Sequence, residues 1–176
     1  MRLLISISII ALIFLVACSK DGPDGYYWGT ATARFNNKAW EADPYAIVNA
    51  PYKQGIDFLI HKFNSQGFQR EDVFVYKVPE QVGKYPISQT EVRDIDSLVG
   101  AQFFTVLDDG GVLGDSYSLL EGVVDNYVEI TKIKGDQVWA EFQVAFVKVS
   151  SNHTPEYPDT IVFTKGKIHT LIVRPE

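Results

Sequence analysis

The side chains best suited to acid–base or metal chemistry are three histidines, His61, His153 and His169. None of the three has a second histidine or an acidic residue at the spacing that protein metal sites use. A Ser-His-Asp hydrolase would also need an exposed nucleophile, and the sequence contains no Gly-x-Ser-x-Gly elbow to present one. We therefore expect no catalytic residues, no metal site and no cofactor, with His61 a half-buried strand residue.

Two acidic clusters offer carboxylates for calcium binding or for glycoside hydrolysis. Asp108-Asp109-Gly110-Gly111, with Asp115 shortly after it, fits no EF-hand spacing, and calcium needs about six to eight oxygen ligands. Glu91, Asp94 and Asp96 form the second cluster, and a glycosidase needs two carboxylates at a set separation that proximity in sequence does not supply. We expect a tight acidic turn at the first cluster and a solvated loop at the second.

Aromatic side chains make up 13% of the sequence, and several fall where a ligand could stack on them. Trp139 stands on the polar side of a predicted strand whose other side is apolar, while Tyr45, Tyr52 and Tyr157 fall in loops or on the polar side of strands. Aromatic faces at a surface can contact sugars or peptides, but β-sheets are rich in aromatic residues in any case. Ordinary sheet composition is the interpretation that we favour, with Trp139 as the leading candidate for a surface contact.

The N-terminal segment has the parts of a secretion signal. Met1-Arg2 is positively charged, and Leu3 to Leu15 is almost wholly apolar but shorter than the roughly 20 residues of a membrane-spanning helix. Leu15-Val16-Ala17-Cys18 resembles the lipobox of bacterial lipoproteins at all four positions. This resemblance implies that residues 1–17 are a lipoprotein signal peptide that is cut off, and that Cys18 is the lipid attachment site.

Cys18 is the only cysteine, so the mature domain has no disulfide, no thiol nucleophile and no cysteine-based zinc site. The two or three acyl chains of a lipidated cysteine, such as palmitate, would hold the protein firmly on a membrane, whereas one chain is marginal. Ser19 to Gly25 is polar and rich in Gly, Pro and Asp, so residues 18–25 are predicted to be the lipidated cysteine and a flexible tether. By the sorting rule of enterobacteria, serine at position 19 favours the outer membrane over the inner one. The protein could then be attached to either the periplasmic or the outer face of that membrane.

The formal net charge of −6 limits the classes of partner. Acidity argues against nucleic-acid binding and against a basic patch that docks on anionic lipid. The partners that we expect are the membrane, through the anchor at Cys18, and a glycan or another envelope protein.

Residues 26–176 form one domain of strands and turns. The clearest hairpin joins Tyr127–Lys134 to Gln137–Val149, whose apolar and polar residues alternate, and Asn36-Asn37 predicts a second hairpin turn. The spacing indicates an all-β domain, either an antiparallel β-sandwich or a flattened barrel. The other predicted strands are 28–35, 38–42, 56–63, 72–78, 102–107, 160–164 and 167–173, the last two flanking Lys165-Gly166, and residues 89–99 are compatible with short helical turns.

Several of these segments resemble a family of small envelope lipoproteins from Bacteroidota whose function is not established. Phe35-Asn36-Asn37-Lys38-Ala39-Trp40 resembles its opening Phe/Val-Asn-Gly-Lys-x-Trp hairpin, and Val82 to Ile87 resembles its Gly-x-Tyr-x-Ile/Leu step. Val128 to Ile133, followed by Val138 to Phe146, resembles its Ile-Thr-Lys hairpin, and Ile161 to Ile168 resembles its final strand. The resemblance implies an all-β fold and an envelope location, and it supplies no catalytic residues.

Three functional hypotheses follow from these observations. The first is a membrane-anchored envelope lipoprotein with a non-enzymatic β-domain that binds a glycan, a peptide or another envelope protein. The second is a hydrolase that uses a carboxylate pair or His61 on an envelope or glycan substrate. The third is a structural subunit whose exposed edge strand accepts a donor strand. A concave, aromatic-lined pocket would favour the first.

Overall fold

The computed structural model describes residues 27–48, 55–90, 98–107, 111–152 and 157–175. The predicted signal peptide and tether, with Cys18, lie outside these residues. The described chain is all-β, as predicted, and none of it belongs to a helix long and apolar enough to cross a membrane. Its ten strands are β1 (Gly29–Phe35), β2 (Lys38–Val48), β3 (Ile56–Phe63), β4 (Gln69–Val78), β5 (Gly83–Gln89), β6 (Val99–Val106), β7 (Leu113–Leu119), β8 (Tyr127–Lys134), β9 (Gln137–Ser151) and β10 (Thr160–Val173).

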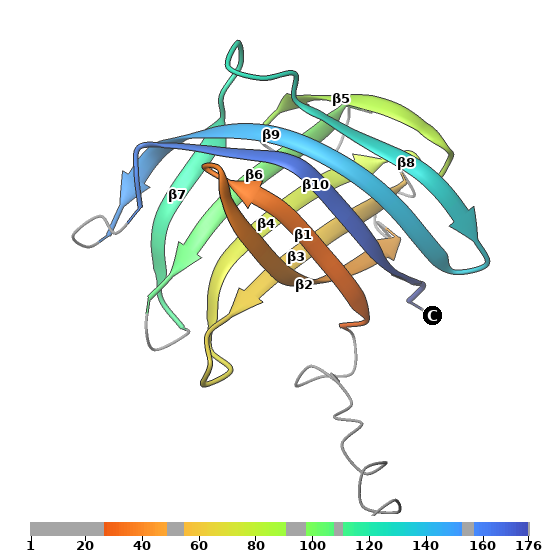
Figure 1. Ribbon diagram of the computed structural model, residues 1–176, viewed down its shortest axis with the longest axis horizontal. Coiled ribbons are helices and arrows are strands. Elements are labelled where there is room, and N and C mark those ends of the chain that lie inside the picture. The colour runs from red at the N-terminus through yellow and green to blue at the C-terminus, as the bar shows by residue number, and fades with distance from the viewer. Residues whose placement is uncertain (1–26, 49–54, 91–97, 108–110, 153–156, 176) are drawn as a thin grey trace, which may run out of the picture.

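The ten strands belong to one sheet that closes on itself. Antiparallel pairings run in a ring from β1 through β2, β3, β4, β6, β7, β9 and β10 and back to β1. β5 and β8 form a further antiparallel pair that links β6 to β9. The closed sheet is the flattened-barrel form of the predicted fold, and Figure 1 shows the long strands β9 and β10 arching across the top of the molecule.

The interior of the barrel is a packed aromatic and aliphatic core. Its largest members are fully buried, and Phe103 lies at the centre, with ring centroids 5.2 Å from Tyr117 and 5.7 Å from Phe163. A barrel of about eight strands is just wide enough for its own side chains to fill it. The fully buried aromatic residues are Phe58, Phe103, Tyr117, Phe142, Phe146 and Phe163.

Alternation and turn chemistry explain why these residues form these strands. In β9, Val138, Ala140 and Phe142 are buried, whereas Trp139 and Glu141 between them face outward, as the alternating pattern predicts. The turn between β1 and β2 places two asparagines at φ 45° and φ 67°. Asparagine tolerates this left-handed conformation better than other non-glycine residues, so the predicted Asn36-Asn37 hairpin is confirmed.

The prediction that Lys165-Gly166 separates two strands is wrong, because β10 runs unbroken through both residues. The chain instead makes a bulge there: its register with β9 shifts between Phe163 and Gly166, and Lys165 has φ 53°. A Cβ atom at Gly166 would lie only 2.4 Å from Cδ1 of Phe142. Glycine is therefore needed for the backbone to pass a core ring, and not for a turn.

Candidate functional site

Because side chains fill the barrel, the outer face of the sheet is where a ligand can bind. A row of three aromatic side chains and one lysine crosses this face, from β8 through β9 and β10 to the residue before β1. The rings of Trp139 and His169, which are paired in register, stack with centroids 4.3 Å apart at an angle of 14°. Trp28 meets the His169 ring edge-on at 5.0 Å, and Nζ of Lys132 lies 4.5 Å from the centre of the Trp139 ring, a cation–π distance. We call Trp28, Lys132, Trp139 and His169 the aromatic ladder.

A groove of about 370 Å³ runs beside the ladder, within the roughly 300–1,000 Å³ of small-molecule sites. Its walls combine two aromatic rings, those of Trp139 and His169, with three hydroxyl groups and two opposite charges. The remaining lining residues are Thr30, Thr32, Thr131, Ala140, Glu141, Lys167 and Ile168. We call this site the ladder groove.

Strand register places the two charged residues of the ladder groove, Glu141 and Lys167, opposite each other. Glu141 of β9 stands directly opposite Lys167 of β10 on one side and Glu129 of β8 on the other. Opposite charges across strands are favourable and like charges are not, so Lys167 offsets the repulsion between the two glutamates. Glu141 and Lys167 are exposed. The groove therefore presents one carboxylate and one ammonium group to a ligand.

A larger hollow of about 570 Å³ lies between β5 and the segment after β7, and it is more open. Its one aromatic residue is Tyr127, and Nζ of Lys84 covers that ring at 3.7 Å from the centroid. This hollow lacks the paired rings of the ladder groove. We therefore take the ladder groove as the better ligand site.

His61 forms a second polar site, on the other side of the barrel. Its Nδ1 lies 2.6 Å from Oδ1 of Asp72, and Nε2 of Gln69 donates to the same carboxylate at 2.6 Å. Both side chains of the His61–Asp72 pair are only 7% exposed. Nε2 of His61 is buried and has no hydrogen-bond partner among the described residues. A carboxylate at Nδ1 is how a histidine base is oriented in hydrolases, but here the other nitrogen lies beneath aromatic rings.

These rings form a continuous patch on the outer face of β2, β3, β4 and β6. Tyr45 stacks on His61 with centroids 5.7 Å apart, and Tyr27 packs edge-on against Tyr45, His61 and Phe63. Phe74 extends the patch to Tyr76 and Phe104 at 6.0 and 5.9 Å. Each of these rings is half-buried. We call Tyr27, Tyr45, Phe63, Phe74, Tyr76 and Phe104 the aromatic collar.

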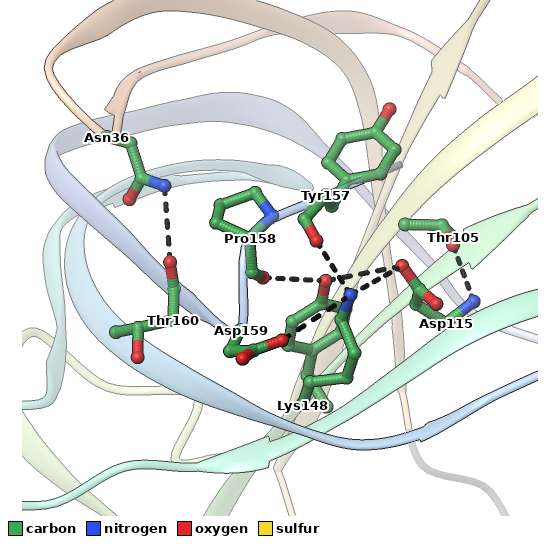
Figure 2. A network of polar contacts seen from close by, with 9 residues as sticks. Asn36, Thr105, Asp115, Lys148, Tyr157, Pro158, Asp159 and Thr160 are labelled. Atoms are coloured by element: carbon green, nitrogen blue, oxygen red, sulfur yellow. Dashed lines mark hydrogen bonds and ion pairs between the residues drawn. The ribbon is translucent and has the colours of Figure 1, made fainter. Parts of the chain in front are cut away.

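Asp115, which the sequence suggests as a possible calcium ligand, belongs instead to a polar network inside one end of the barrel. It is fully buried, and Nζ of Lys148 lies 3.2 Å from its Oδ2. Figure 2 shows Lys148 between Asp115 and the exposed Asp159, next to the backbone oxygen of Tyr157. Burial, and then the Asp115 carboxylate, raise the pKa of the Tyr117 hydroxyl. The network ties β7, β9 and the segment before β10 together.

A second buried carboxylate lies at the same end. Glu71 accepts hydrogen bonds from Nε1 of Trp40 at 2.6 Å and from the Tyr157 hydroxyl at 3.0 Å, and it pairs with Lys62 at 2.9 Å. Three donors thus compensate one buried charge, as burial of a carboxylate requires. We assign these contacts to stability, because the donors come from the protein's own strands and loop.

The structure brings together some predicted site residues and separates others. Trp139 faces outward as expected, and His169, which the sequence left without a partner, stacks on it. The sequence missed Asp72 as the partner of His61; the pairing of β3 with β4, which puts the two opposite each other, is the signal that would have revealed it. Other predicted candidates lie outside the described residues: His153, Asp108, Asp109, Glu91, Asp94, Asp96 and Tyr52.

In the part of the chain that the structure describes, no group of three or more His, Cys, Asp or Glu side chains could hold a metal ion. No protein-family model, no curated protein and no solved structure matches the chain significantly.

Proposed function

We propose that this protein is a lipoprotein of the bacterial cell envelope, of the small Bacteroidota type, whose β-domain binds a carbohydrate in the ladder groove. In this proposal Cys18 carries the lipid and anchors the protein at the outer membrane. The observation that carries the binding role is the stacked pair of Trp139 and His169 beside a groove lined with hydroxyl and charged groups.

The chemistry of the groove suits a sugar better than a peptide or an apolar ligand. Sugar rings present C–H faces and many hydroxyl groups. Lys132 and His169 cover the faces of the Trp139 ring, so the ladder offers ring edges to the groove. Thr30 and Thr32 can each donate and accept a hydrogen bond. Thr131, whose hydroxyl donates to the backbone oxygen of Trp139 at 3.2 Å, can still accept one. Glu141 accepts and Lys167 donates, so acidic and amino sugars are accommodated as well as neutral ones.

The ladder supplies rigidity, which a binding site needs. Trp139 lies between Lys132 from β8 and His169 from β10, and Nε2 of His169 is 3.2 Å from Oε1 of Gln137. Side chains that are already ordered lose little entropy when a ligand arrives. These contacts among the described residues therefore preorganise the site.

Two experiments test the two halves of this proposal. For the anchor, Cys18→Ser should abolish labelling by a palmitate analogue and release the protein from membranes; labelled, membrane-bound variant protein would refute the lipidation. For binding, a glycan array of neutral, amino and acidic oligosaccharides should yield a ligand for the mature protein. Trp139→Ala should bind that ligand about 30-fold more weakly, whereas Gln143→Ala, on the same outward face of β9, should bind it like the parent.

One observation favours the hydrolase as a second candidate, namely the 2.6 Å contact between His61 and Asp72. Burial of Nε2 beneath the aromatic collar argues against it, because a general base must reach the proton that it removes. If the hydrolase were correct, His61→Gln would abolish turnover of an oligosaccharide that the array identifies. Equal turnover in the parent and the variant would remove this candidate.

The donor-strand hypothesis has less support from the topology. Each of the ten strands in the described structure pairs with at least two others. Such a closed sheet has no strand with a whole free edge to accept a donor strand.

A further inference from the structure

The aromatic collar and the ladder groove lie on opposite sides of the barrel. In the ring of paired strands, β3 and β4, which carry the middle of the collar, stand across from β9 and β10, which carry the middle of the groove. Residues at the start of the domain touch both: Tyr27 packs into the collar and Trp28 onto His169. The chain thus enters the domain on the boundary between two different surfaces.

The collar is an apolar surface without a covering layer in the described structure. The single sheet has its core on the inside, and no other described strand packs over the outward rings of β2, β3, β4 and β6. Leu59 lies between Tyr45 and Phe74 in register and extends the patch. Tyrosine and phenylalanine bury large areas, and tyrosine also keeps a polar end. This combination is typical of protein surfaces at the membrane interface.

The length of chain before the collar limits how far it can lie from the anchor. Cys18 precedes Tyr27 by nine residues. A chain of that length spans at most about 30 Å when extended and about 15–18 Å as a flexible linker. Since Tyr27 is itself part of the collar, a lipidated Cys18 keeps the collar within reach of the lipid headgroups.

The charged side chains on the collar face indicate which lipid headgroups the collar can contact. Asp43 and Asp57 lie on the outward side of β2 and β3, and Arg70 lies on the outward side of β4. Acidic groups therefore outnumber basic ones on this face, and the whole chain is acidic. Acidic side chains are repelled by anionic lipids, so the contact has to come from apolar burial. The complementary surface is zwitterionic, as in phosphatidylcholine or phosphatidylethanolamine.

We propose that the aromatic collar rests on the zwitterionic headgroup region of the membrane that carries the anchor, so that the ladder groove faces away from the bilayer. This inference rests on the proposed lipidation of Cys18. It assigns the two outer faces of one sheet to two partners, lipid for the collar and soluble ligand for the groove.

Quenching of tryptophan fluorescence by brominated lipid tests this orientation. The mature lipidated protein is reconstituted in vesicles of phosphatidylcholine with bromine in the upper acyl chain, and its emission is compared with that in unbrominated vesicles. Phe74→Trp, and separately Phe104→Trp, place an added indole in the collar, whereas Gln143→Trp places one on the outward side of β9. Circular dichroism checks that each variant folds like the parent.

We expect the collar indoles to lose most of their added emission in brominated vesicles and the Gln143→Trp indole to lose none. Equal emission of the collar variants in both kinds of vesicle would overturn the proposal, and so would quenching confined to Gln143→Trp. Acyl labelling of the same samples separates this outcome from failure of the anchor: a protein that is labelled and vesicle-bound but shows no collar quenching refutes the orientation alone.

Discussion

The two outer faces of this barrel belong to the same kind of alternating strands, yet polar groups are exposed on one face and buried on the other. On the ladder face, Glu141 and Lys167 stand exposed beside aromatic rings. On the collar face, His61 and Asp72 lie buried beneath aromatic rings. Exposed charges can interact with a soluble ligand, whereas the buried His61 and Asp72 side chains are hydrogen-bonded to each other. Binding of a soluble ligand is therefore expected on the ladder face, and the polar pair of the collar face is expected to contribute to stability.

The difference shows what a closed sheet makes possible. One packed interior supplies the core of the whole domain, so neither outer face is needed to form a second hydrophobic layer. Each face can then differ in chemistry without a change of fold. Substitutions on the two faces should accordingly separate stability from binding.

The largest effect on stability is expected from His61→Ala on the collar face. The substitution leaves the buried Asp72 carboxylate with the hydrogen bond from the Gln69 amide but without the one to His61. Loss of a hydrogen-bond partner of a buried group costs about 1–3 kcal/mol, and more for a charged group such as a carboxylate; the ring contacts of His61 with Tyr27, Tyr45 and Phe74 are lost as well. Urea denaturation at pH 7 should show this loss in the free energy of unfolding, and a loss below about 1 kcal/mol would mean that the pair is not structurally important.

Trp139→Ala on the ladder face should show the reverse pattern. The substitution removes the ring that His169 and Lys132 contact, so affinity for an array-identified oligosaccharide should fall by about 30-fold, as for a hot-spot residue worth about 2 kcal/mol. Isothermal titration calorimetry measures the affinity. Unchanged affinity, with the fold intact, would move the ligand site elsewhere.

Phe74→Ala tests whether the collar contributes to the fold. A half-buried phenylalanine removes about 80–120 Å² of apolar surface from water, worth about 2–3 kcal/mol. We expect a loss of about 2 kcal/mol in unfolding free energy, with oligosaccharide affinity unchanged because the groove lies across the barrel. A drop in affinity together with stability would show that the two faces are coupled.

Alkaline pH should destabilise the collar through its tyrosines. Burial, followed by the carboxylates of Asp57 and Asp72, raises the pKa of the Tyr76 hydroxyl above its usual 10.0. The folded state then holds this proton more tightly than the unfolded state, so its contribution to stability is present below pH 10 and is lost as the pH rises above 10, by up to about 1.4 kcal/mol per pH unit. Tyr76→Phe should flatten the fall in urea midpoint between pH 10 and 12. An identical pH dependence in both proteins would contradict the assignment.

The smallest change in stability is expected from Glu141→Gln. The side chain is exposed, and removing its charge also relieves the repulsion from Glu129 that stands opposite it. The unfolding free energy should change by less than about 0.5 kcal/mol, while binding of amino sugars weakens several-fold. A stability loss as large as that of His61→Ala would refute the contrast between the two faces.

Local patterns in the sequence predict much of the fold. The alternation in β9 and the asparagine turn before β2 each determine local geometry, and both are confirmed. The sequence patterns do not predict strands β5 and β7. β5 contains Pro86 and β7 contains Gly114 and Asp115, and Pro, Gly and Asp are all uncommon in strands. Tertiary pairing overrides those local preferences. Closure of the sheet cannot be read from the sequence either, since it depends on β1 and β10, which are far apart in the chain.

The candidate site was only partly visible in the sequence. Trp139 could be found because its strand alternates clearly. Its stacking on His169 depends on the register of β9 with β10, which the long segment 152–159 joins, and such register has no local signal. The pairing of His61 with Asp72 depends on the register of β3 with β4. A bulge shifts that register next to the 64–68 turn, so counting outward from the turn does not give it directly. Asp115 shows the same limit: in the sequence it resembles a solvated turn residue, and in the structure it is buried against Lys148.

Titration of the vesicle-anchored protein with oligosaccharide is the most direct test of the central claim, that the ladder groove binds sugar. The mature lipidated protein on phosphatidylcholine vesicles should bind an array-identified oligosaccharide saturably, with the same affinity as in detergent. Trp139→Ala should weaken this binding by about 30-fold, whereas Gln143→Ala should leave it unchanged. Parent-like affinity in a folded Trp139→Ala protein, or the absence of any bound oligosaccharide across the array, would contradict the account.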